Sequence, residues 1–496
     1  MAYLTLDISP GLYRTGTDYK SKGRWLNANL WRWFSGEQRP VGGWVAKSIG
    51  TLSGAPRAMI AWKSNGAKLW GCVGTHSHLM ALTSGGYLYD ITPAGFVTGR
   101  ADATTGGAYG DGAYGVGAYG TGQNTSDAIT ADASVWSLDT WGEDLVGVMA
   151  EDGRIWQWTL DVSTSAVAIA GAPTAAAVVV TAERIMMALG AGGNPRQVAW
   201  SDREDNTDWV ETATNYAGSF PLQTVGKLMC GRRVSGGTLL LTDVDAWLAT
   251  FQGQPLVYGF AKVGSQCGIV SRGAIVTTDV QAFWMSYNGF WMFNGYSQPL
   301  ACDVHDYVFS NLNTTQISKV TAVHVSAFGE IWWFYPSAGS TENDRYVVYN
   351  YRETHWNFGA LSRLCGVDKG PFAYPMMCDF DQEDGAGHVW DHENGFDHGG
   401  LAPFAESGPV ELGQGDQTVM VRKIVPDVSA PGNVTVSFAT HIYPNDGGMA
   451  FGPYALSAQT DVRFSARSVS VGFNAADGSD FRIGGFRFEV TARGMR

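Results

Sequence analysis

The stretch EDGRIWQWTL, residues 151–160, joins a Gly- and Asp-containing turn to a short run of alternating character. In an extended chain, Trp156 and Trp158 fall on one face, whereas Gln157 and Thr159 fall on the other. This period of two is typical of a half-buried β-strand. The unit decides the fold because it recurs along the chain.

Copies of this turn-and-aromatic unit occur from about residue 51 to residue 404. With Trp156, Trp200, Trp247, Trp291 and Trp332 as markers, the intervals are 44, 47, 44 and 41 residues. A spacing of about 40–50 residues per four-stranded unit is the period of a β-propeller. We therefore predict an all-β chain in which residues 51–404 form a β-propeller.

The composition supports this prediction. The 496 residues include 64 Gly, 19 Trp and 12% aromatic residues. So much Gly disfavours a helical bundle, because each helix-interior Gly costs roughly 1 kcal/mol, and so many aromatics disfavour disorder. The strongest competing helix, Thr174 to Gly190, contains three consecutive valines and is flanked by Gly, which favours strands.

The pattern changes after residue 404. Segments such as VTVSFATHIYP and FRFEVTARG alternate apolar and polar residues between Pro- and Gly-containing turns. Four or more such strands suit a small β-sandwich, so residues 405–496 are predicted to be a β-sandwich platform domain.

Residues 1–50 form a basic, Trp-rich arm. Residues 1–48 hold seven Lys or Arg against three acids, a local charge of +4 that leaves −17 for the rest of a chain of net charge −13. Basic residues among aromatics could bind nucleic acid. The favoured interpretation is an arm packed on its own or a neighbouring subunit, with buried rings and guanidinium groups at the rim. The docking-arm candidates are Arg14, Arg24, Trp25, Trp31, Arg32 and Trp33.

Residues 101–125 interrupt the propeller period with three tandem copies of GAYG. Tyr109, Tyr114 and Tyr119 give this tract evenly spaced aromatic side chains. We expect a Gly- and Tyr-rich loop that lines a channel or contacts a partner, with a featureless linker as the alternative.

No metal or cofactor is expected. The cluster Asp202, Glu204, Asp205, Asn206 and Asp208 lacks the order of a calcium loop and suits self-capping turns better. The histidines His388, His392 and His398 lie among glycines that disfavour a helix preset for zinc, and His76 and His78 share a strand face only. The common nucleophile, zinc-protease and phosphate-loop motifs are absent from the sequence, so we expect no enzyme.

The six cysteines occur singly, as expected for reduced core residues. The N-terminal MAYLTLDISPG has no signal-peptide pattern, and the sequence has no apolar stretch of about 18 residues. We therefore expect synthesis in a cytoplasm and no membrane insertion.

Three segments together resemble one family: GTDYKSKGRWLNANLWRW with PVGGW, the central VAWSDREDNTDW, and the terminal FRIGGFRFEVTARGMR. They are similar to the tail nozzle, or tail hub, proteins of short-tailed bacteriophages, related to the phage DNA-stabilisation family. The GAYG repeat has no counterpart in that pattern.

The resemblance implies a structural protein of the virion tail, made in the host cytoplasm. It would form a homohexameric ring that extends the DNA channel below the portal and adaptor, retains the packaged genome and takes part in DNA ejection. The implied partners are the head–tail adaptor, tail-fibre or needle proteins, and double-stranded DNA that passes without sequence-specific binding. The alternative is a carbohydrate-binding or hydrolysing propeller at a phage tail tip.

Overall fold

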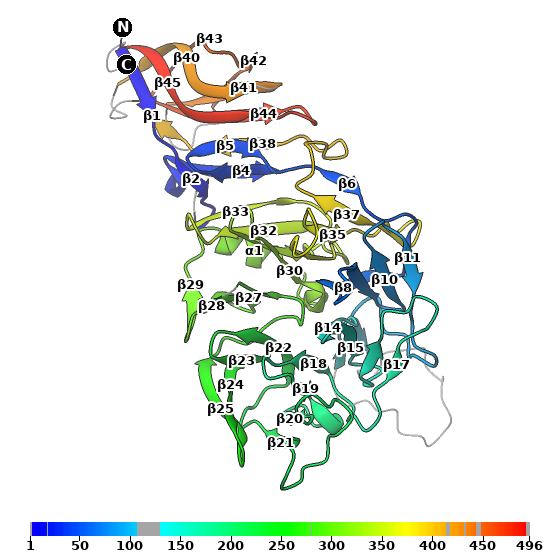
Figure 1. Cartoon of the computed structure of the whole chain (residues 1–496). Helices are drawn as coiled ribbons and strands as arrows, with labels where there is room; N and C mark the ends of the chain where they lie inside the picture. The colour runs from blue at the N-terminus through cyan, green and yellow to red at the C-terminus, as the bar shows by residue number, and fades with distance from the viewer. Residues whose placement is uncertain are drawn as a thin grey trace, which may run out of the picture.

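The computed structural model describes residues 2–16, 18–106, 129–278, 280–412, 417–430, 433–442 and 448–492. Within these residues, seven four-stranded antiparallel sheets follow one another around a central axis (Figure 1). The first strands of neighbouring blades contact each other all the way round, and β34 of the last blade contacts β8 of the first. The ring is a closed, seven-bladed β-propeller.

The blades are built from consecutive strands, with one exception in the last blade. Blade 1 has β8 (Pro56–Lys63), β9 (Leu69–Thr75), β10 (Leu79–Thr83) and β11 (Leu88–Asp90); blade 2 has β14 (Trp136–Trp141), β15 (Asp144–Met149), β16 (Trp156–Trp158) and β17 (Val167–Ala168); blade 3 has β18 (Ala177–Val180), β19 (Met186–Leu189), β20 (Gln197–Trp200) and β21 (Gly218–Pro221); blade 4 has β22 (Leu228–Val234), β23 (Gly237–Thr242), β24 (Asp245–Gly253) and β25 (Val257–Ser265). Blade 5 has β26 (Ile275–Thr277), β27 (Ala282–Ser286), β28 (Gly289–Phe293) and β29 (Ser297–Leu300); blade 6 has β30 (Thr321–Val325), β31 (Glu330–Tyr335), β32 (Arg345–Asn350) and β33 (His355–Ala360); blade 7 has β34 (Cys365–Val367), β35 (Met376–Cys378), β37 (Val389–His392) and β6 (Trp44–Ala46).

Blade 7 takes its outer strand from the other end of the chain. β6 pairs with β37, so that Trp44 lies opposite His392 and Ala46 opposite Trp390. A segment that precedes blade 1 therefore closes the ring. This differs from the predicted division, in which residues 1–50 belonged to the arm, because the pattern of one short strand does not reveal its pairing partner.

Both faces of a blade are apolar, since each sheet is packed between two others. All six residues of β31, EIWWFY, are buried. Trp332 and Phe334 join one hydrophobic cluster, whereas Ile331, Trp333 and Tyr335 join another. Successive side chains of a strand point to opposite faces, so one strand contributes to two inter-blade cores.

The two ends of the chain build one two-sheet body, which we call the platform. Its strands are β1 (Ala2–Leu6), β2 (Ser9–Leu12), β3 (Arg24–Asn29), β4 (Trp31–Phe34), β5 (Glu37–Pro40), β38 (Phe404–Ser407), β39 (Val410–Glu411), β40 (Val419–Ala430), β41 (Val434–His441), β42 (Met449–Ala455), β43 (Thr460–Ala466), β44 (Ser468–Ala475) and β45 (Arg482–Ala492). One sheet runs β4-β5-β45-β40-β43, with β1 also on β45. The other runs β2-β3-β38-β44-β41-β42, with β39 also on β44.

The platform lies at one end of the elongated molecule, beyond blade 6 (Figure 1). Its strands β2 and β3 contact β33, the outer strand of that blade. One hydrophobic cluster runs from blades 4–6 into both platform sheets. The fold is thus all-β, a propeller with an N-terminal arm and a C-terminal sandwich that share a core.

The remaining elements are short. Thr174 to Gly190 contains the hairpin β18–β19, which confirms the prediction of strands there. The helical segments are α1 (His305–Ser310), η1 (Asp18–Ser21), η2 (Ala191–Gly193) and η3 (Ile317–Lys319), and two small sheets pair β7 (Leu52–Ser53) with β36 (Ala386–Gly387) and β12 (Thr104–Gly106) with β13 (Ile129–Ala131). Among the described residues, no helix is long and apolar enough to cross a bilayer.

Candidate functional site

The tryptophans of the arm lie inside the molecule. Trp25, Trp31 and Trp33 are at most 4% exposed. Trp25 and Trp31 pack on Phe473 of β44, and Trp31 also packs on Phe481. These rings dock the arm onto its own chain, so they are not on the surface of the monomer.

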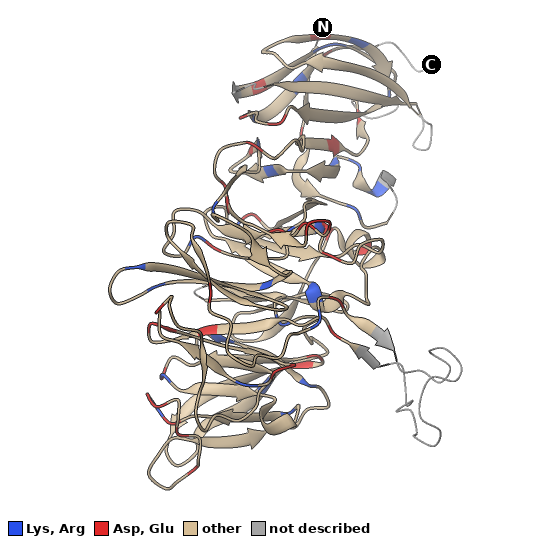
Figure 2. Ribbon diagram, turned by 90° about the vertical axis from the view of Figure 1, so that its right-hand side faces the viewer, with Lys and Arg blue, Asp and Glu red and all other residues tan. Residues whose placement is uncertain are grey.

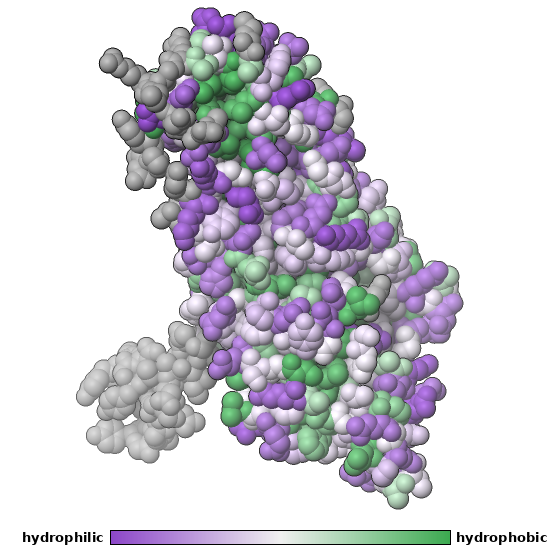
Figure 3. Space-filling view, turned by 90° about the vertical axis from the view of Figure 1, so that its left-hand side faces the viewer, coloured by the Kyte–Doolittle hydropathy of each residue, from purple (hydrophilic) through white to green (hydrophobic). Residues whose placement is uncertain are grey.

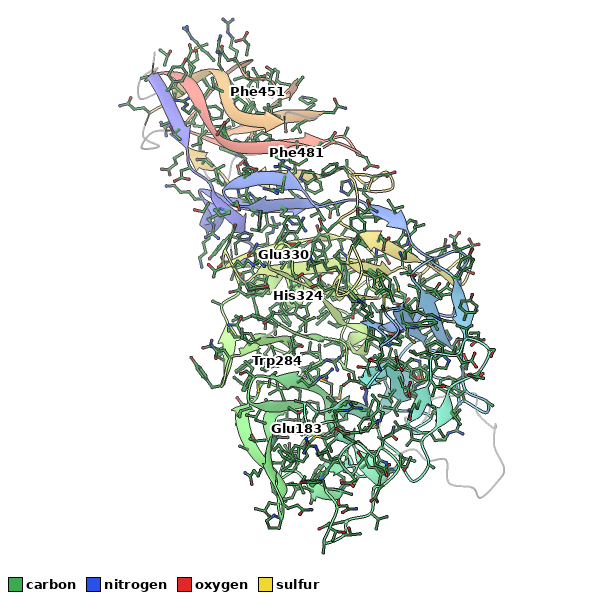
Figure 4. All side chains as sticks on the ribbon, in the orientation of Figure 1. Glu183, Trp284, His324, Glu330, Phe451 and Phe481 are labelled. Carbon is green, nitrogen blue, oxygen red and sulfur yellow. The ribbon has the colours of Figure 1, made fainter. Side chains whose placement is uncertain are left out.

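Arg32 is also buried, which differs from the prediction that the guanidinium groups lie at the rim. Its Nε and Nη2 donate to the two carboxylate oxygens of Glu330, each at 2.8 Å. Its Nη1 and Nη2 donate to Glu393 at 2.9 and 2.6 Å. Figure 4 shows Glu330 where the platform meets the propeller. Burial alone would lower the pKa of Arg32, but the charges of Glu330 and Glu393 outweigh it and raise the pKa.

The other two basic candidates lie nearer the surface. Arg24 Nη2 forms an ion pair with Asp303 Oδ2 at 3.0 Å, and the backbone N–H of Arg14 donates to the carbonyl of Asp303 at 2.8 Å. Arg24 is therefore engaged with the propeller, and Arg32 cannot reach a DNA phosphate. The alternative interpretation of the arm, as a surface that binds nucleic acid, is therefore wrong for Arg32.

The gate candidates Tyr109, Tyr114 and Tyr119 lie outside the described residues. The segments that flank them, residues 99–106 and 129–135, are described and include the β12–β13 pair. We call these two flanking segments the stem. They belong to the connection between blades 1 and 2.

The stem is anchored by a buried ionic cluster. Lys319 of η3 is fully buried, and its Nζ contacts Asp102 Oδ1 at 2.5 Å and Glu342 Oε1 at 2.9 Å. Both oxygens of Glu342 also accept bonds from Arg57 of β8, at 2.7 and 2.6 Å. Through Arg57, the cluster includes the first strand of blade 1. Lys319 precedes the first strand of blade 6, and Glu342 lies in a loop of the same blade. Asp102 connects these parts to the stem.

Further bonds hold the stem across the ring. The backbone of Ala103 both donates to and accepts from the side chain of Gln316, at 2.9 and 3.0 Å. The N–H of Ala133 donates to Ser318 Oγ at 3.1 Å. Lys227, at the entry of blade 4, pairs with Asp132 at 3.1 Å. The stem therefore connects blades 1 and 2 with blades 4 and 6 at the end of the axis where the inner strands begin.

A cavity of about 340 Å³ lies on the propeller axis. Its lining comes from the first strands of blades 1, 2, 4, 5, 6 and 7 or the residues next to them. The charged side chains in that lining are Arg57, Arg232, Arg272 and Asp368, together with His324, which is labelled in Figure 4. The rest is largely apolar. We call this space the axial cavity.

The predicted acidic cluster is used in turns. Asp205 Oδ1 accepts the N–H and the hydroxyl of Thr207, at 2.9 and 2.6 Å. Asp202 Oδ1 accepts the N–H of Tyr216 at 2.7 Å, and Asn206 donates to Gln157. The interpretation as self-capping turns is confirmed for Asp205, whereas Asp202 and Asn206 bond to residues outside the cluster. No group of three or more His, Cys, Asp or Glu in the described part of the chain could hold a metal ion.

The predicted histidine cluster is divided among structural bonds. His392 Nε2 lies 2.8 Å from Arg363 Nε, and His398 lies between the carbonyl of Val41 and Asp477. His76 Nδ1 accepts the N–H of Ala55 at 3.0 Å. His78 contacts Ser77 Oγ at 2.8 Å, and His388 lies 3.5 Å from Asp379.

Sequence reasoning missed the acids that hold the arm and the stem, of which Glu330 and Glu342 are buried and Glu393 is partly buried. Glu330, Glu342 and Glu393 stand singly, and no motif marks them. The available signal was weak: Arg57 in APRAMIAW and Glu330 in GEIWWFYP are isolated charges beside apolar runs in a chain with only 16% charged residues. A buried charge requires a partner, but the pattern does not say which.

No protein-family model and no curated protein matches this sequence. Among solved structures, the chain is similar to the WD40 domain of Neurospora crassa Pan2, with a TM-score of 0.41, 8% identity, and coverage of 70% of this chain and 94% of that one. It is also similar to a streptogramin B lyase, with a TM-score of 0.39, 8% identity, and coverage of 70% and 97%. A third similar structure is a catalytically inactive virginiamycin B lyase from Staphylococcus aureus with quinupristin. Its TM-score is 0.39 and its identity 6%, with coverage of 69% of this chain and 98% of that one. These similarities concern the propeller fold alone.

Proposed function

We propose that this chain is a structural protein of a bacteriophage tail, a nozzle subunit that assembles as a homohexameric ring below the portal and adaptor. The proposal rests on the resemblance of its sequence segments, and one structural observation supports it best. N-terminal and C-terminal strands pair in the same two sheets and form a single platform at one end of the molecule, while the propeller occupies the other end. A ring can use such a platform for contacts with its neighbours and the adaptor.

The platform has open sheet edges that suit self-assembly. Among the described strands, β42 pairs only with β41, and Met449 at its start is 68% exposed. Ile442, which follows β41, is 54% exposed. Figure 3 shows hydrophobic residues gathered in the platform on the face it presents. Unpaired edges and exposed apolar side chains are typical association surfaces, and a heterologous contact that closes produces a ring.

DNA would run along the axis of the ring, between subunits, and not through a propeller. The axial cavity holds about 340 Å³ and the stem lies across one end of it. The major groove of B-DNA alone is about 12 Å wide, so a duplex is too wide to enter such a space. In Figure 2 the Lys and Arg residues are interspersed with Asp and Glu along the described ribbon. Because the chain has a net charge of −13, it would displace few counterions from the DNA phosphates and would bind DNA weakly enough to let it slide.

The proposed role is structural and not enzymatic. Paired catalytic carboxylates need a free acid and a free base in one cleft. The most deeply buried glutamates here, Glu330 and Glu342, are neutralised by Arg32, Arg57 and Lys319. Buried ion pairs of this kind position elements and leave no proton to transfer.

The decisive experiment is native mass spectrometry of the purified chain, followed by electron cryo-microscopy of phage particles. We expect a hexamer, and a six-fold ring at the tail that accommodates this fold with its platform toward the head. A Met449→Glu variant should reduce ring formation, whereas Val167→Glu, at an exposed site on the outer strand of blade 2, should not. A chain that stays monomeric and is absent from particles would refute the proposal.

A second candidate, carbohydrate binding at a tail tip, is favoured by an aromatic surface on blades 3 and 4. Phe220 of β21 and Phe260 of β25 stack with a centroid distance of 5.1 Å and an interplanar angle of 5°. A polar groove of about 460 Å³ nearby is lined by Glu211, Thr212, Ala213, Asn215, Gln254 and Pro255. Glycan arrays test this candidate. Binding that is lost in Phe220→Ala would support it, and no binding to any host polysaccharide would reject it.

A further inference from the structure

Two arginines in the axial cavity have no carboxylate partner. Arg272, in the turn before β26, donates from Nη1 to the carbonyl of Ala176 at 3.2 Å. Arg232 of β22 donates to the adjacent carbonyl of Gly231 at 3.1 Å. Among the described residues neither forms an ion pair, although neighbouring Arg233, on the opposite face of β22, pairs with Asp139.

The two acids whose charges act on Arg272 each form an ion pair with another residue. Glu151 and Asp132 are close enough to act on its charge, but Glu151 binds Arg100 at 2.7 Å and Asp132 binds Lys227 at 3.1 Å. Burial lowers the pKa of Arg272 despite those acids. Arg272 and Arg232 are both half-buried. A half-buried guanidinium without a direct counter-charge has lost part of its hydration, and proteins normally supply a partner.

Both arginines belong to the lining of the cavity, and both lie close enough to the buried thiol of Cys230, beside the cavity, to act on it. Burial raises the pKa of the Cys230 thiol, and the charges of Arg232 and Arg272 both oppose that rise. The cavity lining contains three arginines but only one acid, Asp368. Asp368 is occupied by the backbone N–H of Lys369 at 2.8 Å, and its other oxygen lies 3.7 Å from His324. Arg57 is occupied by Glu342.

The remaining lining is suited to an apolar group. Met59, Leu138, Ile275 and Val323 are among the lining residues, whereas the indole of Trp136, which also contributes to the lining, is stacked on Phe96. A volume of about 340 Å³ lies within the usual range of small-molecule sites. Such a site combines a positive end with an apolar body.

We propose that the axial cavity binds a small organic anion, whose phosphate or carboxylate meets Arg272 and Arg232 and whose apolar part packs in the lining. The site is separate from the platform and does not depend on ring assembly. A bidentate oxyanion matches the fork of a guanidinium and would give Arg272 and Arg232 a direct ionic partner.

Isothermal titration of the whole chain with phenyl phosphate and with benzoate tests the proposal, and the two probes distinguish a phosphate from a carboxylate ligand. We expect one saturable site per chain for at least one probe. Arg272→Gln and Arg232→Gln should each raise the Kd of the probe about tenfold or more. Arg233→Gln is the matched control and should leave it unchanged, and neutral benzyl alcohol should bind more weakly than either anion.

Failure of both anions to bind, equal binding of benzyl alcohol, or unchanged affinity in Arg272→Gln would overturn the proposal. If Arg272→Gln does not fold, a structure of the unaltered chain with p-bromophenyl phosphate decides the question. The anomalous signal of bromine in the axial cavity supports the site, and its absence there refutes it.

Discussion

Arg32 of the arm and Glu330 of blade 6 form a two-pronged ion pair, although 298 residues separate them in the chain. Trp332 Nε1 donates to the same carboxylate at 3.0 Å, and the second carboxylate on Arg32, that of Glu393, also accepts the N–H of Gly42. Every charge at this junction is therefore bonded. The relationship explains how a basic arm becomes part of a buried core.

Arg32→Met should strongly destabilise the platform–propeller junction, because it leaves the buried Glu330 and the partly buried Glu393 without this counter-charge. We expect a loss of about 3–5 kcal/mol, measured by urea unfolding. Arg233→Met removes an exposed ion pair with Asp139 and should cost only about 0–1 kcal/mol. Equal losses in the two variants would contradict this account of the junction.

Gly43→Ala should disturb the closure of the ring. A Cβ at Gly43 would lie 2.4 Å from the carbonyl oxygen and 2.5 Å from the nitrogen of Asp397, and backbone atoms cannot move aside as a flexible side chain can. We expect a cost of about 1–3 kcal/mol, with faster hydrogen exchange in β6 and β37. Gly339→Ala, where a Cβ would meet no atom within 4 Å, is the control. A thermal midpoint as high as that of the unaltered chain would refute the argument.

Glu342→Gln should loosen the stem. The carboxylate holds Arg57 and Lys319 together, so its neutralisation leaves two buried cations with weaker partners. Amide exchange in β12 and β13 should accelerate at least about tenfold, since the loss of a buried pair exceeds roughly 1.4 kcal/mol. Lys227→Met, which removes the exposed pair with Asp132 on the same stem, should change exchange little. The same acceleration in both variants would mean that burial is not the cause.

The stability of the chain should fall as the pH decreases below about 6.5, in part through His392. Burial, followed by the charges of Arg363 and His398, holds the pKa of His392 well below its usual value. Below pH 6.5, His392 of the unfolded chain binds a proton, whereas His392 of the folded chain stays neutral. The free energy of unfolding is therefore unaffected by His392 above pH 6.5 and decreases as the pH falls below it.

The measurement is the free energy of unfolding at about pH 7.5 and at about pH 5. His392→Gln keeps an acceptor for Arg363 and should lose less stability between the two values than the unaltered chain. His305→Gln changes an exposed histidine and should keep the original difference. An identical pH dependence in His392→Gln would show that His392 makes no contribution.

The propeller period was predictable because it depends on local alternation. Four of the five Trp markers, such as Trp156 and Trp247, lie on the third strand of their blades. Trp332 lies on β31, the second strand of blade 6, which accounts for the shorter final interval. The interruption of the propeller period at residues 101–125 coincides with the stem and the residues between its two strands.

The candidate sites were less predictable. The sequence identified the arm as aromatic and basic, but the burial of Arg32 depends on two glutamates from different blades. The axial cavity could not be anticipated either, because residues from six blades line it and each contributes only a few.

The sequence by itself determined the class of structure: short strands, tight turns, a repeat of about 44 residues and a change of pattern near residue 404. These features follow from period-two burial and turn chemistry, which act between near neighbours. Only the tertiary structure decided that β6 closes blade 7, that the arm shares its sheets with the C-terminal strands, and that Arg272 lines a cavity whose acid, Asp368, bonds to other groups. Strand partners and counter-charges come from residues that are far apart in the sequence, so the local sequence pattern does not identify them.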